Sequence, residues 1–425
     1  MLPIFWDVKN RHPTLGSKSI FISFSSSWFD RYFRWVQAKL FTFLGALLFS
    51  MSLSAQFPWT TAEVGVMGGQ ILDIYPNMPA TSLQRCAFGA VRWGGDSPYL
   101  ELYGYPEHGV ILSFQDLGNP STLGYGIGLQ YQVGFEKYIS KRFRWTTRIN
   151  VGGIYATRPY HFIDNPENII FGSPFSALIS ASTGARYKFR QLALSAHVSY
   201  WHSSNAHTVI PNVGMNTPML MLGLERFFYI EDVFVVDTTH HPYSLPPQWG
   251  LIIRGGFGIN EAGGTIRPTN GSKYNKRLLA IGASYRYKTI HRLSFTLEGY
   301  HDEAYDLWNE TMQWSQDSPF LGASALMFMV GHEYLYGHFG LVIQAGVNLH
   351  NPTLDHLIGE VEQDNFSNRL KARVPGRFAL RYYVNKDEYN LGSLYVQAAV
   401  KSNMGQADFL ELGIGTIISG RQLDR

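Results

Sequence analysis

The feature that most constrains this chain is a series of short alternating segments that runs from Glu63 almost to the end. In each segment, apolar and polar side chains alternate over about ten residues, a length typical of membrane-spanning strands. Successive side chains of a strand point to opposite faces, so each segment predicts a strand with one apolar and one polar face. We expect strands near residues 63–72, 85–94, 108–117, 124–138, 143–157, 176–189, 192–204, 217–229, 248–259, 277–289, 293–303, 321–335, 339–349, 377–385, 393–402 and 408–418.

The connections between these segments alternate in length. Short turns are expected near Ser140-Lys141 and Arg190-Gln191, whereas long polar loops are expected near 158–175, 205–216, 260–276, 304–320 and 350–371. Outer-membrane barrels have short periplasmic turns and long external loops. An antiparallel sheet of this many strands also needs closure to avoid open edges. The pattern predicts an all-β fold, an antiparallel transmembrane β-barrel of about 14–16 strands, with about 12 as the open alternative, preceded by a signal peptide.

Composition agrees with one repetitive β architecture. Aromatic residues make up 15% of the chain, charged residues only 16%, and there are 42 glycines, which suits strands and turns better than solvated surface. The mean hydropathy of -0.10 hides the membrane signal, because alternating strands average to neutral. The net charge of +3 indicates no nucleic-acid partner, and a single cysteine, Cys86, excludes an intramolecular disulfide.

One continuous apolar segment, Leu40–Leu53, follows a basic stretch and is followed by small residues. This order predicts a secretory signal peptide over residues 1–55, cleaved after Ala55. The stretch before the apolar segment is long, so a misplaced start and an extended signal both stay open. Residues 56–425 are then expected to form a single integral barrel domain in the outer membrane. The long connection at 230–247, on the short-turn side, does not fit the alternation.

Candidate catalytic side chains stand at the end of the strand predicted at 192–204. With period two, His202 and Ser204 extend the apolar face of this strand, whereas Ser203 points to the polar face. Ester hydrolysis needs a nucleophile, a base, a partner that orients the base, and donors for the oxyanion. Ser204 and His202 can supply the first two on the lipid-facing side. Asn205 offers an amide donor, and Asn216 on the next strand has the parity to face the same side.

Two neighbouring motifs carry a family resemblance. His202-Ser203-Ser204-Asn205-Ala206, followed by Pro211-Asn212-Val213-Gly214-Met215-Asn216, resembles the His-x-Ser-Asn and Asn-x-Gly motifs of the outer-membrane lipid A 3-O-deacylases (PagL-like) and the related bacterial acyloxyacyl hydrolases. Tyr105–Gly109 and the stretch from Thr157 to Ser173 add support, so the resemblance covers roughly 63–229. It implies that Ser204 is the nucleophile, His202 the general base and Asn205 an oxyanion donor.

The third catalytic position departs from the family. The deacylases carry a glutamate where this chain has Asn216. A neutral amide can orient an imidazole, but it cannot stabilise the imidazolium as a carboxylate does. Asn216 is therefore the expected orienting residue, and Asp164, Glu167 and Glu261 stay open as acids that reach the site from a loop.

The resemblance implies a function. We expect a serine esterase, a carboxylic ester hydrolase of the lipid A deacylase type, that removes an ester-linked fatty acyl chain from lipid A or lipopolysaccharide. Arg158 and His161, beside a predicted external loop, are candidates for contacts with lipid A phosphates. Membrane lipids are the other expected partners, nucleic acid is not, and a homodimer stays open. No cofactor is expected.

The sequence leaves one alternative function open and offers one further candidate for a metal site. A non-catalytic outer-membrane porin or transport barrel is the alternative function, and residues 230–425 either enlarge the barrel or have a function of their own. His240-His241 and the pair His332 and His338 suggest metal binding. They lack a third ligand at suitable spacing, and His332 and His338 would lie about 20 Å apart on an extended strand, so no metal site is expected.

Overall fold

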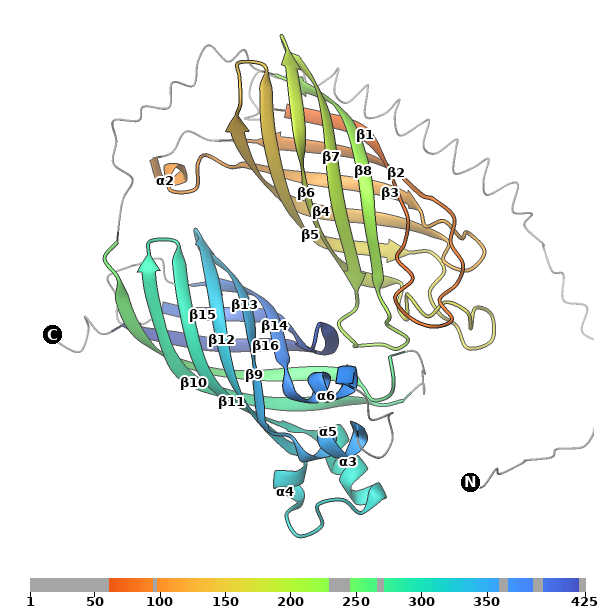
Figure 1. Ribbon diagram of the computed structural model, residues 1–425, viewed down its shortest axis with the longest axis vertical. Helices are drawn as coiled ribbons and strands as arrows, with labels where there is room; N and C mark the ends of the chain where they lie inside the picture. Colours follow the sequence, from red (N-terminus) through yellow and green to blue (C-terminus); the bar gives the residue numbers. More distant parts are fainter. Residues whose placement is uncertain are drawn as a thin grey trace, which may run out of the picture. The chain divides into compact units, whose positions relative to one another are not determined.

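The strands of this protein close as two separate antiparallel barrels of eight strands each (Figure 1). The computed structural model describes residues 61–94, 98–228, 245–265, 271–358, 366–384 and 393–419. The signal peptide predicted over 1–55 lies outside these residues. Each of the sixteen predicted strands matches an observed one within a few residues, which confirms the all-β transmembrane barrel fold.

The first barrel is formed by strands that each pair with their neighbours in the sequence. It closes where β1 pairs with β8, in a register that sets Thr61 opposite Phe227. Its strands are β1 Thr61–Gly69, β2 Gln84–Trp93, β3 Glu107–Asp116, β4 Tyr125–Tyr138, β5 Phe143–Ala156, β6 Phe175–Phe189, β7 Leu192–Ser204 and β8 Met215–Phe227.

The second barrel repeats this arrangement. It closes where β16 pairs with β9, with Leu410 opposite Ile259. Its strands are β9 Gln248–Glu261, β10 Lys273–Lys288, β11 His291–Asp302, β12 Ser324–Tyr336, β13 Phe339–His350, β14 Pro375–Tyr383, β15 Ser393–Asn403 and β16 Gln406–Ser419.

The expectation of a single barrel is thereby corrected. A sheet that avoids open edges must pair every strand on both sides, but the alternating pattern does not say which strands pair. Here β1 takes the free edge of β8, and β16 takes the free edge of β9. The connection at 230–247, which broke the alternation of loop lengths, is the segment that joins the two barrels.

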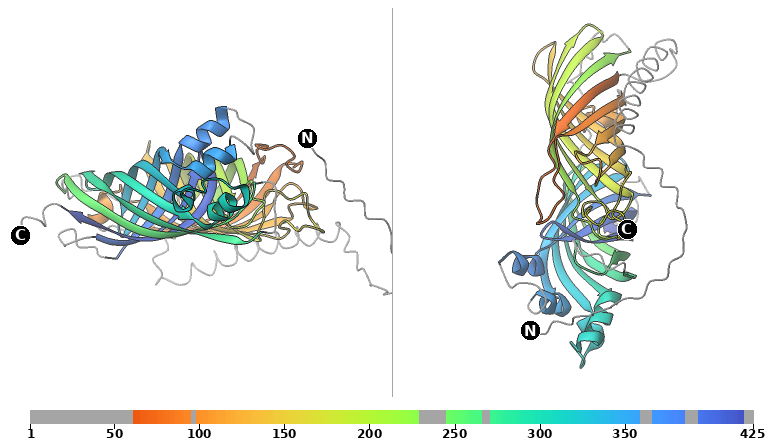
Figure 2. Two further views of the ribbon diagram at one scale, coloured as in Figure 1. Left: turned by 90° about the horizontal axis from the view of Figure 1, so that it is seen from below. Right: turned by 90° about the vertical axis from the view of Figure 1, so that its right-hand side faces the viewer.

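Short helices occupy several connections that the sequence led us to expect as irregular loops. On the second barrel, α3 Glu303–Met312, α4 Pro319–Gly322, α5 Pro352–His356 and α6 Phe366–Arg373 all lie at the end where the loops are long (Figure 1, Figure 2). Asp302 caps α3 by accepting a hydrogen bond from Ala304 N at 3.0 Å. On the first barrel, α2 Pro98–Glu101 lies between β2 and β3. None of the helices in the described residues is long and apolar enough to cross a membrane.

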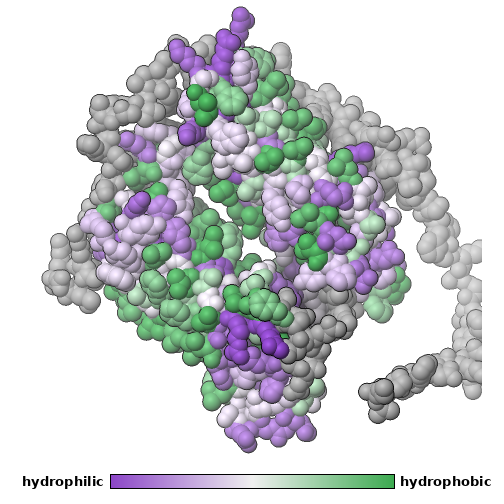
Figure 3. Space-filling view, viewed as in Figure 1, coloured by the Kyte–Doolittle hydropathy of each residue, from purple (hydrophilic) through white to green (hydrophobic). Residues whose placement is uncertain are grey.

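The outer faces of the strands are apolar. On β7 and β8 the exposed positions include Val198, Leu220 and Leu222, with exposed fractions of 57%, 67% and 59%. Figure 3 shows hydrophobic residues over the strand walls and strongly hydrophilic ones toward the tips of the barrels. In water such a surface would be unfavourable, whereas a bilayer solvates it, so this belt is the membrane-facing surface of the protein.

The lumens hold buried ion pairs. In the first barrel, Glu225 lies within 3 Å of the guanidinium groups of Arg92, Arg148 and Arg186. In the second, Glu298 and Glu411 pair with Arg254 and Arg377, and Glu333 pairs with Arg292 and Arg381. Eight strands enclose a space that side chains can fill, and here charged side chains occupy it. Buried ion pairs therefore occupy part of each lumen.

Candidate active site

The three residues that end β7 divide between its two faces as the period-two pattern predicts. Ser203 points into the lumen, where it is fully buried and its hydroxyl is among the buried polar atoms without a hydrogen-bond partner. His202 and Ser204 are partly exposed on the outer face. The candidate base and nucleophile therefore share the membrane-facing side, near the end of β7 that leads into a long loop.

Asn216 contacts His202 across the strand ladder. The two residues are direct partners on β7 and β8, and His202 Nδ1 lies 2.8 Å from Asn216 Oδ1. The hydroxyl of Tyr200 donates to the same oxygen at 3.0 Å. A carbonyl oxygen can only accept, so Nδ1 carries the proton and Nε2 is left as the basic nitrogen. This is the tautomer that a general base needs.

Ser204 is held by the loop that follows it, residues 205–214, here called the nucleophile loop. Asn212 Nδ2 donates to Ser204 Oγ at 2.9 Å, and the backbone N–H of Ala206 donates to the same hydroxyl at 3.1 Å. Asn212 Oδ1 accepts from the backbone N–H of Asn205 at 3.1 Å. Two N–H donors thus converge on Ser204 Oγ. The sequence places Asn212 in the Asn-x-Gly motif but predicts no role for its side chain.

Gly214 lies close to both His202 and Ser204. Its φ of +77° is in the left-handed region that favours glycine. A Cβ atom placed there would lie 3.6 Å from His202 Cε1, 3.7 Å from Ser204 Cβ and 2.9 Å from Ser203 O. The His202 and Ser204 side chains are therefore close neighbours, although no hydrogen bond joins them in this structure. Such bonds often tighten only when substrate is bound.

The amide of Asn205 is engaged within the loop. Its Nδ2 donates to Val209 O at 2.7 Å and to Ser173 Oγ at 3.3 Å, and the residue is buried. These contacts brace the nucleophile loop against itself and against residues 157–174, the loop between β5 and β6. The oxyanion role that the resemblance implies for Asn205 stays a prediction.

None of the three acids that are alternatives to Asn216 contacts His202 in the part of the chain that the structure describes. Asp164 pairs with His161 at 3.1 Å on an exposed part of the β5–β6 loop, where Glu167 is also exposed. Glu261 accepts a hydrogen bond from the backbone N–H of Ile210 at 2.9 Å. Of the residues that the structure describes, Asn216 is the one that it brings to His202 Nδ1.

The candidate substrate-binding residues Arg158 and His161 lie in the β5–β6 loop. Both are exposed. The carbonyl of Arg158 accepts hydrogen bonds from Asn165 and Asn168, which order this loop while leaving the guanidinium at the surface. Val213 N donates to Ile169 O at 3.1 Å, so this loop packs against the nucleophile loop.

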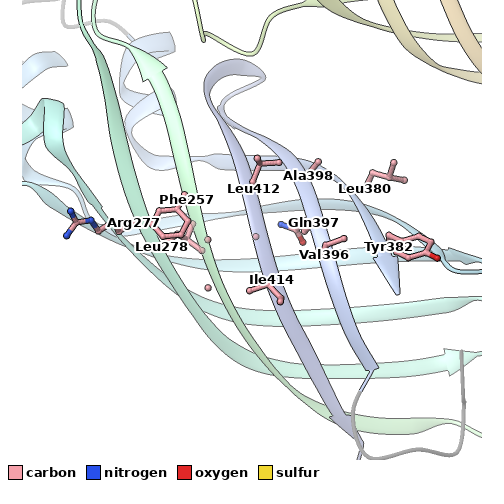
Figure 4. Close-up of a pocket in the computed structure, with 13 residues that line it drawn as sticks. Phe257, Arg277, Leu278, Leu380, Tyr382, Val396, Gln397, Ala398, Leu412 and Ile414 are labelled. Carbon is pink, nitrogen blue, oxygen red and sulfur yellow. The ribbon is translucent and has the colours of Figure 1, made fainter. Parts of the chain in front are cut away.

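An apolar groove of about 750 Å³ lies on the wall of the second barrel (Figure 4). Phe257, Leu412 and Ile414 line it together with Gly255 and Gly256. Its lining contains no serine, cysteine, histidine or carboxylate, so it offers no nucleophile or base. The groove belongs to the apolar belt of this barrel.

Histidine and cysteine form no metal centre in the part of the chain that the structure covers, since no group of three or more His, Cys, Asp or Glu residues is arranged to hold an ion. His332 lies 3.2 Å from His291 through their ring nitrogens. Cys86 is buried in the first barrel. His240-His241 lie outside the described residues.

Comparison with known proteins assigns a separate match to each barrel. Residues 87–225 match the family described as lipid A 3-O-deacylase (PagL), and residues 248–419 match the acyloxyacyl hydrolase, C-terminal domain. No curated protein matches the chain in sequence.

Solved structures that resemble the chain are barrels at low identity. One is the crystal structure of the outer membrane enzyme PagL, with 13% identity, a TM-score of 0.28, and coverage of 38% of this chain and 97% of that one. Another is OccAB3 from Acinetobacter baumannii, with 10% identity, a TM-score of 0.21, and coverage of 85% and 98%.

Proposed function

We propose that this protein is an outer-membrane esterase that removes an ester-linked fatty acyl chain from lipid A, with Ser204 as nucleophile. The first barrel matches the lipid A 3-O-deacylase (PagL) family, and the second matches the acyloxyacyl hydrolase C-terminal domain. The observation that carries this proposal is the arrangement at the end of β7. His202 is oriented through Nδ1 by Asn216, and Ser204 stands beside it on the face that meets the membrane.

The site supports acyl transfer in two steps. Ser204 Oγ attacks the ester carbonyl while His202 Nε2 takes its proton, and the oxyanion that forms accepts hydrogen bonds from N–H donors. When the intermediate collapses, the ester C–O bond breaks, and His202 gives the proton to the departing sugar oxygen, which leaves as a hydroxyl. Water, deprotonated by His202, then attacks the acyl group on Ser204. The bond between the acyl carbon and Ser204 Oγ breaks, His202 returns the proton to Ser204 Oγ, and the fatty acid is released.

Donors for the oxyanion are supplied by the nucleophile loop. Asn212 Nδ2 and Ala206 N both lie within 3.1 Å of Ser204 Oγ. Since the carbonyl oxygen of a bound ester lies close to the attacking hydroxyl, we assign these two groups as donors. In this scheme Asn205 supports them by bracing the loop through Val209.

The location of the site suits a substrate that never leaves the membrane. An acyl chain can lie along the apolar wall of β7 and β8, while the sugar and phosphates meet the long loops above. Arg158 and His161 are exposed there and are proposed to contact the phosphates. The alternative of a transport barrel is disfavoured, because ion-paired side chains occupy both lumens.

The proposal is tested by mass spectrometry of lipid A from cells that express the wild type or Ser204→Ala. Wild-type cells should contain lipid A with one acyl chain fewer, and the variant should leave lipid A intact at equal barrel abundance. An unchanged acyl pattern in both, with the wild-type barrel folded, would contradict the enzymatic function.

A further inference from the structure

The nucleophile loop of the first barrel is hydrogen-bonded to the end of β9 and the residues just beyond it. The backbone N–H of Ile210 donates to Glu261 Oε2 at 2.9 Å. The N–H of Glu261 donates to His207 O at 3.1 Å, and the N–H of Asn212 donates to Thr265 O at 2.9 Å. All five residues are buried, so losing one of these bonds leaves a polar group without water.

The Glu261 carboxylate joins two segments. Besides Ile210, it accepts from the backbone N–H of Gly271 through Oε1 at 3.2 Å. Hydrogen bonds to a carboxylate are stronger than those between neutral groups. Nearby, burial lowers the pKa of His207, so its imidazole is neutral near neutral pH and does not neutralise Glu261. The negative charge is instead met by peptide N–H groups, one of which belongs to the nucleophile loop.

Asn212 connects this anchoring to the nucleophile. Its backbone is bound to Thr265, and its side chain is bound to Ser204 Oγ and to the N–H of Asn205. A shift of the nucleophile loop relative to β9 therefore moves an amide donor relative to Ser204. Misplacement of a catalytic group by about 1 Å can lower a rate by about 100-fold.

We propose that Glu261 is a positioning residue for the reaction at Ser204, and that the second barrel serves to pre-organise the nucleophile loop. This inference rests on the proposed function. Glu261 has no hydrogen bond to Ser204 or His202, so its effect passes through Ile210 and Asn212. Through these contacts, a residue of the second barrel affects the reaction at Ser204 of the first barrel.

The test compares variants of the full chain purified in detergent. Glu261→Ala removes both acceptor oxygens and should lower kcat for lipid A deacylation by about 10- to 100-fold with KM nearly unchanged. Glu261→Gln keeps one acceptor oxygen and should lower kcat less, by about 3- to 10-fold. The matched control is Glu310→Ala, an exposed glutamate of α3, which should leave kcat unchanged. Heat-modifiability on gels reports whether each barrel is folded.

Two further readouts make the outcomes distinct. The rate at which a fluorophosphonate labels Ser204 should fall in parallel with kcat in the Glu261 variants. A folded Glu261→Ala protein with wild-type kcat and labelling rate overturns the inference, as does a raised KM at unchanged kcat. If Glu261→Ala does not fold, Glu261→Gln decides, and unchanged kcat there overturns it. Failure of the proposed function gives a different result: the wild type itself would show neither labelling nor deacylation, or Ser204→Ala would deacylate lipid A as fast as the wild type.

Discussion

Replacing Asn216 by aspartate tests what a carboxylate adds at the position where the resemblance implies one. Asp has the shape of Asn, so its oxygen can keep the 2.8 Å contact with His202 Nδ1 and the hydrogen bond from Tyr200. In the proposed mechanism, the new negative charge would stabilise the imidazolium that forms when His202 takes the proton of Ser204. Two charges about 4 Å apart interact by about 1 kcal/mol in water and about 4 kcal/mol near a protein surface.

The partial exposure of His202 and Asn216 favours the lower part of that range. Taking about 1.4 kcal/mol gives a kcat about tenfold above wild type at high pH. The same stabilisation makes the imidazole harder to deprotonate, so the acid limb of the rate profile should move up by about one pH unit. Asn216→Glu, which restores the family's residue with one more methylene, should change both quantities in the same direction.

Steady-state kinetics between pH 5 and 9 on the detergent-purified protein measure both effects. The control is Asn216→Asp in a His202→Ala background, where the charge should bring no gain. Asn216→Ala should reduce kcat less than His202→Ala, since the base is still present. If Asn216→Asp and Asn216→Ala both match the wild type, then Asn216 does not orient the base, and Asp164, Glu167 and Glu261 become the residues to test.

Three other predictions concern the same site. Ser204→Ala should abolish deacylation and leave the barrel heat-modifiable, because the side chain is not part of the lumen. Ser203→Ala should keep activity, and the reverse result would mean that the face assignment is wrong. Asn212→Ala and Asn212→Asp both remove an amide donor and should lower kcat by about 100- to 1,000-fold. Near wild-type turnover in either variant would mean that Asn205, not Asn212, is the oxyanion donor. A tag inserted near Thr208 should be labelled on intact cells and one at Ser140-Lys141 only after permeabilisation, since loop lengths place these ends on opposite sides of the membrane; labelling of the first only in permeabilised cells would refute the topology.

Much of the fold follows from the sequence, because the alternation of apolar and polar residues along a strand shows which face each side chain occupies. The positions of the sixteen strands, the lumen-facing side chain of Ser203 and the outward side chains of His202 and Ser204 depend on period two alone, which is a local property. The pairing of His202 with Asn216 needed one further step, the register between adjacent strands. The loop between β7 and β8, residues 205–214, is long, so this register is set by the pairing of the two strands rather than by a tight turn.

The closure into two barrels and the contacts that hold Ser204 and its loop were decided only by tertiary structure. Whether β8 pairs with β1 or with β9 depends on which edges meet after collapse, and both choices satisfy the same alternating pattern. The contacts of Asn212 with Ser204, and of Glu261 with Ile210, join loop residues whose backbone follows no period. Sequence periodicity determines which face a strand residue occupies, whereas the meeting of two loops depends on the packing of all the strands that carry them.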